Sequence, residues 1–496
     1  MVDKLNLGAC LLRGSEELSS ESNLRVPMLP KSKLKYSLGS NDFIISSVRW
    51  QNGFGFPGTK TGKLINAKVT ANSDVSKPQK STISKPKRYL TIQLPENDPV
   101  THIVLDECDA GDSFYFVFPN SDLEISIMAD RLRVSPESLH KNILSSVNDD
   151  LDGNSSIPGY VPNPCSLDYL LRWCLDIRRS PSRPLLRALA QHTKDPKEQR
   201  RLLELCSVQG SEEFTKYVRM SGISLVDLLM AFPSCQPSIS LLIEMIPRLL
   251  PRAYTVACHK SKWGCVLRFV YSLLQVMPAE NGIQFARYGA CSGWMKTLQT
   301  DDIVQIILKE PSKFRLPPLF NPGKLRLEDI TSIPLIMVGP GTGIAPFIAF
   351  LEKIRYLVKE DGQNKHRVRR ILLYGSSNFS EEFLFESELK AFVEEGILTD
   401  LLLCESRPLV DTEEKLATSK PKYVQDGLKS TGKQICEYML NSEINEKKDS
   451  LAGALFFACG DVKAMSKSLW ACLGDILQTH QGYTPHSQWS YSKNCV

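Results

Sequence analysis

Four short polar or glycine-rich stretches in the last third of the chain each follow an apolar run. They are GPGTG (339–343), YGSS (374–377), ESR (405–407) and ACGD (458–461). Ligands of open α/β sheets bind at the carboxyl ends of the strands, so these stretches could form one site. Glycines let the backbone approach a ligand, and a following helix offers unpaired N–H groups to an anion. GPGTG matches neither the P-loop pattern G-x-x-x-x-G-K-[ST] nor the strict dinucleotide pattern G-x-G-x-x-G. We interpret it as a loop that binds a pyrophosphate, and the alternative is a strand–helix turn without a ligand.

The side chains near these ends suggest a nucleotide. Ser406 and Arg407 could hold a phosphate monoester, which favours a 2′-phosphorylated nucleotide, although a plain surface pair remains the alternative. Tyr423 and Gln425 could stack on and hydrogen-bond an adenosine. Cys459 stands beside a glycine turn, so its thiol is a candidate for the catalytic neighbourhood as well as for simple packing.

Two earlier stretches have a similar chemistry. In RAYT (252–255), Arg252 and Thr255 could grip phosphate while Tyr254 stacks on a planar ring. GACSG (289–293) is a small-residue loop that could bring backbone N–H groups to a diphosphate. Phosphate-type loops in two modules predict two dinucleotides that meet in a cleft between domains.

The elements that must position these residues change in character along the chain. Four apolar runs, which begin at Ile333, Arg369, Asp400 and Ala454, are typical of buried strands, and a helix-like segment follows each. Strands that alternate with helices predict a parallel sheet covered on both faces. Short β segments are expected at YLTIQL (89–94), HIVLDE (102–107) and FYFVFPN (114–120).

Between these β regions the spacing of apolar residues becomes three and four, which predicts six or seven amphipathic helices. The predicted plan has four parts. These are a linker-like or loosely structured region at 1–84, a β-barrel made from 85–122 and 250–330, a helical insertion at 123–249 and an α/β module at 331–496.

Composition excludes several function classes. The 496 residues carry a net charge of only +5, which gives no strong case for nucleic acid. The 14 cysteines contain no C-x-x-C pair, so we expect no metal site, and free thiols without a recognisable secretory signal suggest the cytoplasm. The uncharged run from Ile333 to Leu351 contains Pro334, Pro340 and Pro346, so we do not expect it to cross a membrane.

The chain resembles the FAD/NADPH half of the diflavin reductases. The resemblance rests on six motifs, which occur in this order: RAYT, GACS, GPGTGIAPF, YGSS, SR…KYVQD and CGD. The helical region is similar to the connecting domain of that family. The resemblance implies a multidomain fold: an antiparallel β-barrel that binds FAD, with an all-α connecting insertion, followed by an α/β parallel-sheet module that binds NADPH, as in ferredoxin-NADP reductases.

The resemblance also implies roles for individual residues. Those implied for FAD are Arg252, Tyr254, Thr255, Gly289, Ala290, Cys291 and Ser292. Those implied for NADPH are Gly341, Thr342, Ser406, Arg407, Tyr423 and Gln425. Cys459 would assist hydride transfer beside the nicotinamide, and the hydroxyl of Thr255, where the family usually has serine, would act near the flavin. A hydride would pass from NADPH to FAD, which would then release single electrons.

The sequence departs from the family in three respects. No stretch of residues 1–85 resembles an FMN site, so we expect FAD and NADPH but not FMN on this chain, with a separate FMN-binding protein if FMN is needed. Pro421 stands where the family usually has a lysine. The tail SQWSYSKNCV brings Trp489 soon after Cys459, so we do not expect Trp489 to shield the flavin.

Long stretches such as LLMAFPSCQPSISLL and IPLIMVGPGTGIAPFIAFL resemble the branch of the family that serves cobalamin-dependent methionine synthase. The resemblance therefore implies that enzyme as the partner, whereas the small net charge and the prolines noted above lead us to expect neither nucleic acid nor a membrane. Two alternatives stay open. One is an NADPH–FAD diaphorase that reduces quinones, ferric complexes or a ferredoxin, and the other is a catalytically reduced scaffold that only binds methionine synthase.

Overall fold

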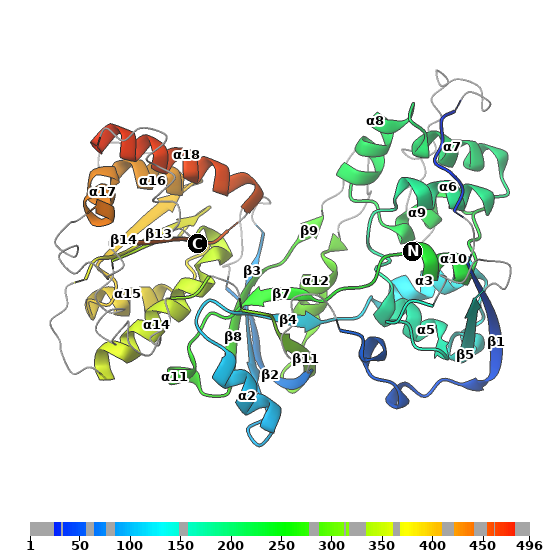
Figure 1. Cartoon of the computed structure of the whole chain (residues 1–496), viewed down its shortest axis with the longest axis horizontal. Helices are drawn as coiled ribbons and strands as arrows, with labels where there is room; N and C mark the ends of the chain where they lie inside the picture. Colours follow the sequence, from blue (N-terminus) through cyan, green and yellow to red (C-terminus); the bar gives the residue numbers. More distant parts are fainter. Residues whose placement is uncertain are drawn as a thin grey trace. The chain divides into compact units, whose positions relative to one another are not determined.

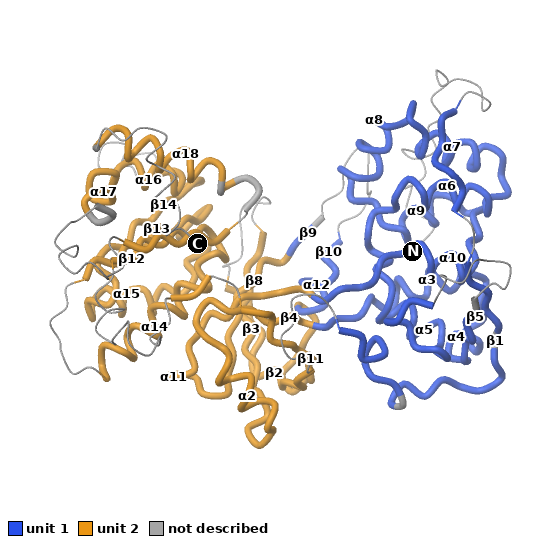
Figure 2. The backbone as a smooth tube through the Cα atoms, viewed as in Figure 1, with its two compact units in different colours: residues 1–57, 117–251, 274–295 blue, residues 58–116, 252–273, 296–496 orange. Residues whose placement is uncertain are grey.

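The chain forms two compact units, and each is assembled from several segments (Figures 1 and 2). The computed structural model describes residues 24–30, 33–55, 64–75, 85–147, 157–276, 287–311, 314–316, 334–360, 368–408, 421–440, 454–460 and 462–481. Unit 1 takes its residues from 1–57, 117–251 and 274–295, and unit 2 from 58–116, 252–273 and 296–496. Trp489 and Ser487 lie outside the described residues.

Unit 2 contains a six-stranded barrel with the strand order β7-β4-β11-β2-β3-β8. The strands are β7 (Arg252–Thr255), β4 (Ser113–Val117), β11 (Ile303–Leu308), β2 (Ile65–Asp74), β3 (Lys87–Gln93) and β8 (Val266–Ser272). An antiparallel bridge between Val256 and Phe269 joins the end of β7 to β8 and closes the sheet. Alternate residues of β2 face the interior, where Ile65, Ala67 and Val69 are buried.

Two short helices flank the barrel. These are α2 (Pro99–Glu107) and α11 (Lys260–Trp263). The segment HIVLDE lies in α2, so the expected strand there is wrong. Asp98 caps the helix by accepting a hydrogen bond of 3.0 Å from the N–H of Val100, and Pro99 occupies the first helical position, where its missing N–H costs nothing.

The second part of unit 2 is a parallel sheet with the order β14-β13-β12-β15. The strands are β14 (Asp400–Glu405), β13 (Arg370–Ser376), β12 (Leu335–Val338) and β15 (Leu455–Ala458). Helices α14 (Ala345–Glu360) and α15 (Glu386–Glu394) cover one face. Helices α16 (Val424–Ser430), α17 (Gly432–Leu440) and α18 (Val462–Gln481) cover the other (Figure 1).

The two covered faces explain why the strands of this sheet are apolar throughout. Leu335 and Met337 of β12 pack with α14 and α15, whereas Ile336 and Val338 pack with the helices of the opposite face. A strand that is buried on both sides needs apolar residues at every position. The antiparallel barrel and the parallel sheet together confirm the predicted fold class.

Unit 1 is mainly helical. Its helices are α3 (Asp122–Leu132), α4 (Pro136–Leu139), α5 (Leu167–Tyr169), α6 (Arg183–Gln191), α7 (Pro196–Cys206), α8 (Ser211–Glu213), α9 (Leu225–Ala231), α10 (Ile239–Met245) and α12 (Ala290–Thr297), with wider turns η5 (Leu170–Cys174) and η6 (Phe214–Met220). Short 3₁₀ turns η3 (Ile45–Ser47) and η4 (Trp50–Gly53) precede them. Local caps start the predicted helices: Ser224 and Asp227 form a reciprocal capping box on α9.

The helical unit also contains strands that were not predicted from the sequence. They are β1 (Leu34–Asp42), β5 (Lys141–Val147) and β6 (Cys165–Ser166), which form a three-stranded sheet, and the pair β9 (Gln275–Val276) and β10 (Arg287–Tyr288). β1 and β2 lie within 1–84, the range expected to be linker-like. Each has a partner far away in sequence, because β1 pairs with β5 and β2 pairs with β11 as well as with the neighbouring β3.

Within the described ranges, no helix is both long and apolar enough to span a bilayer. The same ranges contain no group of three or more His, Cys, Asp or Glu side chains that could hold a metal ion.

Candidate functional site

A cavity of about 740 Å³ opens in unit 2 where the strand ends of the parallel sheet meet residues of β3, β7 and β8. Nine residues singled out from the sequence line it. They are Tyr254, Thr255, Gly341, Thr342, Ser406, Arg407, Tyr423, Gln425 and Cys459. Residues from the barrel and from the parallel-sheet module therefore face a common space. Its volume lies within the ~300–1,000 Å³ typical of small-molecule pockets.

The loop after β12 is a tight 3₁₀ turn, η7 (Gly341–Ile344), which leads directly into α14. Gly341 has a φ of +56°, a conformation that residues with a Cβ rarely adopt. Ala345 and Pro346, the first residues of α14, also line the cavity. The helix N-terminus, with its unpaired N–H groups and positive dipole end, therefore adjoins the cavity and suits an anionic group.

Cys459 follows β15 and is held beside this loop. Its N–H donates a hydrogen bond of 2.9 Å to the carbonyl oxygen of Val338, so the loops after β12 and β15 lie against each other. Burial raises the pKa of the Cys459 thiol to about 11. The group is therefore a protonated thiol at neutral pH, which can donate a hydrogen bond but is not a ready nucleophile.

Ser406 and Arg407 end β14 at another part of the cavity. Their backbone N–H groups donate to the carbonyl oxygens of Ser376 (3.1 Å) and Ser377 (2.8 Å), which fixes the turn against the YGSS stretch. The side chain of Arg407 is exposed, and Tyr423 is 53% exposed. A hydroxyl, a guanidinium and an accessible aromatic ring thus lie where a phosphate monoester and a base could bind.

Gln425 is less free than expected, because its Nε2 donates a hydrogen bond of 2.8 Å to Ser468 Oγ. The amide lines the cavity while it also ties α16 to α18. This bond uses one of the two N–H groups of Nε2, so it does not engage the second N–H or the amide oxygen.

The RAYT stretch is strand β7, paired with β4. The hydroxyl oxygens of Thr255 and Ser113 lie 3.0 Å apart, and the ring of Tyr254 meets Phe116 edge-on with centroids 5.6 Å apart. Tyr254 and Thr255 line the cavity from fixed positions. Arg252 is exposed on the same strand and is not among the lining residues.

The four small residues Gly289, Ala290, Cys291 and Ser292 lie in unit 1, outside this cavity. The predicted loop is wrong in one respect, because most of it is the first turn of the eight-residue helix α12. The backbone N–H groups of this stretch therefore belong to a helix N-terminus and not to a loop. Cys291 and Ser292 are buried, and Ser292 Oγ accepts a hydrogen bond of 3.2 Å from the N–H of Leu274. The N–H of Gly289 donates a hydrogen bond of 2.7 Å to the carbonyl oxygen of Leu274.

Lys87 lines the cavity and was not among the residues predicted from the sequence. It lies on β3, its side chain is only 10% exposed, and its ammonium forms an ion pair with Glu382. A Cβ on Gly341 would lie 3.7 Å from Lys87 Cε, which puts this cation beside the glycine turn. Only a lysine at the start of an apolar strand is visible in the sequence, because the contact depends on how β3 meets the loop after β12.

Two segments match known domain families. Residues 107–294 match an FAD-binding domain, and residues 337–469 match an oxidoreductase NAD-binding domain. The matches support an FAD-binding domain and an NAD-binding domain in this chain.

The relatives are more specific. The methionine synthase reductase of Caenorhabditis elegans is 37% identical over 95% of this chain and 64% of its own length. That of Homo sapiens is 34% identical over 79% of this chain and 56% of its own length. An NADPH–cytochrome P450 reductase from Dictyostelium discoideum is 31% identical over 61% of this chain and 40% of its own length. The chain is homologous to methionine synthase reductases over most of its sequence, and it spans less than two thirds of those relatives.

Proposed function

We propose that this chain is an NADPH-dependent FAD reductase whose electrons serve the reductive reactivation of cobalamin-dependent methionine synthase. The observation that carries the proposal is the cavity of unit 2, where Cys459 and the glycine turn share one space with Tyr254 and Thr255. A nicotinamide donor and a flavin acceptor must meet in such a space. The methionine synthase reductases among the relatives support the choice of partner.

The residues around the glycine turn suit a dinucleotide. A Cβ on Gly343 would lie 2.0 Å from the Cys459 carbonyl oxygen, so the turn has no side chain at this close approach and leaves the start of α14 open to the cavity. Gly341 and Thr342 would bind the diphosphate, with Lys87 as an adjoining cation. Ser406 and Arg407 would hold a 2′-phosphate, while Tyr423 and Gln425 would contact the adenosine.

When bound, NADPH supplies a hydride to FAD, which releases the electrons one at a time. The residues of the chain bind, orient and exclude water. Tyr254 would stand against the flavin ring, held edge-on by Phe116. Thr255 would present a hydroxyl oriented by Ser113, and the protonated thiol of Cys459 would contact the nicotinamide. We assign the catalytic roles to Cys459 and Thr255 on these grounds.

FAD would also need a group for its diphosphate. We propose Gly289 and the first residues of α12, Ala290 to Ser292, for this role, and we propose Arg252 as a further FAD-binding residue. The FAD-binding part would then comprise 85–122 and 250–330 together with β2, and the NADPH-binding part 331–496. We further propose that the residues of this sequence bind no FMN, so that a separate FMN site would pass electrons to methionine synthase.

None of the twelve cysteines in the described part of the chain is in a disulfide bond. We therefore propose that the protein works in a reducing compartment, the cytoplasm.

Purified protein with added FAD tests the proposal. The flavin released by acid should be FAD, and the bound flavin should bleach with NADPH, but far less with NADH, when oxygen is excluded. In steady state, ferricyanide should be reduced, whereas cytochrome c should be reduced poorly until an FMN protein is added. Protein that binds no flavin would instead support a scaffold, and strong cytochrome c reduction by the chain alone would contradict the assignment of FMN elsewhere.

A second assay addresses the partner. Addition of the chain, an FMN protein and NADPH to cob(II)alamin methionine synthase with S-adenosylmethionine should restore methionine formation. If ferricyanide is reduced and methionine formation stays absent, the diaphorase alternative replaces the reactivation role.

A further inference from the structure

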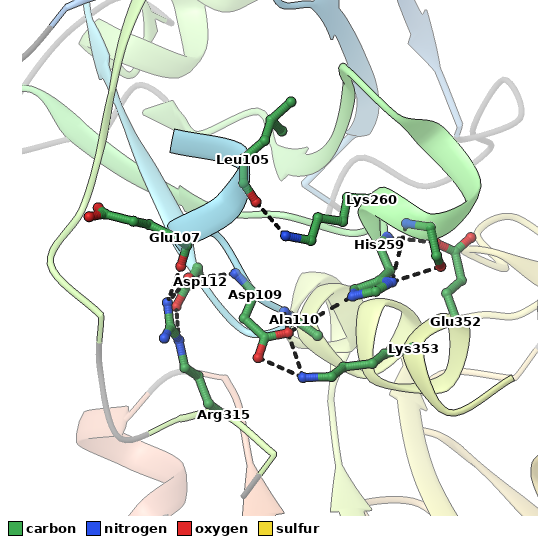
Figure 3. A network of polar contacts seen from close by, with 11 residues as sticks. Leu105, Glu107, Asp109, Ala110, Asp112, His259, Lys260, Arg315, Glu352 and Lys353 are labelled. Carbon is green, nitrogen blue, oxygen red and sulfur yellow. Dashed lines mark hydrogen bonds and ion pairs between the residues drawn. The ribbon is translucent and has the colours of Figure 1, made fainter. Parts of the chain in front are cut away.

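A buried carboxylate on α14 ties the parallel-sheet module to one turn of the barrel (Figure 3). The Glu352 side chain is 1% exposed and accepts three hydrogen bonds. The donors are the N–H of His259 (2.7 Å), Lys262 Nζ (3.1 Å) and Trp263 Nε1 (3.0 Å). All three belong to the turn that contains α11. One carboxylate therefore fixes the position of a whole turn.

The next residue of α14 makes a second connection with the opposite charge. Lys353 Nζ lies 2.7 Å and 2.6 Å from the two carboxylate oxygens of Asp109, which follows α2 (Figure 3). Burial alone would raise the pKa of Asp109, but the charge and hydrogen bond of Lys353 lower it below the usual value, so this carboxylate is ionised near neutral pH. The two connections reach different turns of the barrel, so together they oppose both sliding and rotation of α14.

Both connections are continuous with the proposed reaction site. α14 begins immediately after the glycine turn, and Glu352 lies two helical turns further on, roughly 10 Å along the axis. On the barrel side, His259 follows shortly after Thr255, the last residue of β7. Any shift of α14 relative to the α11 turn would therefore change the separation between the glycine turn and Tyr254 or Thr255.

We propose that Glu352 is a positioning residue for hydride transfer, which holds the glycine turn of η7 in register with Tyr254 and Thr255 by binding the His259–Trp263 turn. This inference rests on the proposed NADPH–FAD reductase function. Neither Glu352 nor its three donors are among the residues that line the cavity, so Glu352 acts through α14 and α11. A buried carboxylate is an expensive way to join two elements, since apolar packing would stabilise them as well. Three directed hydrogen bonds, unlike apolar packing, allow only one alignment of α14 with the α11 turn.

The test compares Glu352→Gln with Arg355→Gln. Arg355 is on the same helix and pairs with Glu395, so its ion pair stays within the parallel-sheet module and provides a matched control. A displacement of about 1 Å at a reacting centre costs on the order of 100-fold in rate. Glu352→Gln should therefore slow flavin reduction by NADPH roughly 10- to 100-fold, while the FAD content and the dissociation constant for NADP⁺ stay within about 2-fold. Arg355→Gln should behave as the parent protein.

Hydrogen exchange gives a readout that does not depend on turnover. Amides of residues 259–263 should exchange faster in Glu352→Gln and not in Arg355→Gln. Faster exchange together with a parental rate of flavin reduction would show that Glu352 is only structural and would overturn the proposal. If the parent protein itself is not reduced by NADPH, it is the proposed function that fails.

If Glu352→Gln does not fold or loses FAD, the milder variant Lys262→Met decides. It removes one donor from a side chain that is 45% exposed. It should slow flavin reduction by a smaller factor with the FAD content intact, and no change in that rate would overturn the proposal.

Discussion

Gly343 lies so close to Cys459 that a Cβ atom on the glycine would stand 2.0 Å from the cysteine's carbonyl oxygen. The obstacle is backbone, which cannot move aside as a flexible side chain can. The glycine turn and the cysteine loop therefore form one rigid edge of the cavity. Several expectations about the nucleotide site depend on this contact or on the charges around it.

Gly343→Ala should force the two loops apart. Overpacking of a buried site typically costs about 1–3 kcal/mol, so the urea midpoint should fall, and NADP⁺ should bind at least 10-fold more weakly. Gly55→Ala is the matched control, because a Cβ at Gly55 would meet nothing within 4 Å. Calorimetric titration with NADP⁺ and urea unfolding check both effects. Parental binding by Gly343→Ala would show that the loops can separate without loss of the site.

Arg407→Ala should weaken NADPH much more than NADH, because only NADPH carries the 2′-phosphate. Loss of a hydrogen bond to a charged group costs roughly 1.5–3 kcal/mol, which corresponds to about a 10- to 150-fold higher dissociation constant. Arg369→Ala serves as the control, since Arg369 is exposed on the same unit and outside the cavity. Equal weakening of both nucleotides would assign Arg407 a different role.

Cys459→Ala should slow flavin reduction while FAD remains bound, because the protonated thiol would be missing beside the nicotinamide. Cys436→Ala removes a buried thiol that does not line the cavity and should leave the rate unchanged. Alkylation of Cys459 in the parent protein, followed by mass spectrometry, should be slow at pH 7 and accelerate as the pH approaches about 11, the pKa of the buried thiol. Fast alkylation at pH 7 would argue against a protonated group.

Stability should fall in mild acid because of His259. Burial, and then the charges of Lys353 and Lys260, lower the pKa of His259 from 6.5 to about 4, although Asp109 opposes the shift. The unfolded chain gains a proton below pH 6.5 and the folded chain does not, so stability present above pH 6.5 is lost as the pH falls towards 4. The loss amounts to up to about 3 kcal/mol.

Urea unfolding between pH 7.5 and pH 4.5 measures this dependence. His259→Gln should flatten it, and His102→Gln, at an exposed position of the same unit, should not. A parental pH dependence in His259→Gln would contradict the assignment to His259.

The sequence predicted the parallel sheet well because β12 and its neighbours are apolar at every position, a pattern that only a doubly covered sheet requires. It failed at α2, where HIVLDE is short enough to suit either a strand or a helix and the deciding cap at Asp98 lies outside the apolar run. It also missed β1 and β2, whose many polar residues resemble a linker. β1 pairs with β5 and β2 pairs with β11, and both partners are distant in sequence.

In the candidate site, too, some residues could be predicted from the sequence and others could not. Residues at strand ends, such as Gly341, Arg407 and Cys459, could be found because the α/β architecture brings strand ends together. Lys87 could not, because it belongs to the barrel and reaches the cavity only through the packing of β3 against the glycine turn. Glu352 could not be predicted for a related reason. Nothing in the sequence of α14 shows whether a carboxylate on this helix contacts the α11 turn or solvent.

The chain passes from one unit to the other five times, after residues 57, 116, 251, 273 and 295. No single proteolytic cut could therefore release either unit as an intact fragment. During synthesis, the helical unit cannot be completed until residues 274–295 have left the ribosome, by which time two segments of the barrel have already emerged. A truncated chain that ends after the helical insertion, near residue 251, would lack part of both units rather than yield one finished unit.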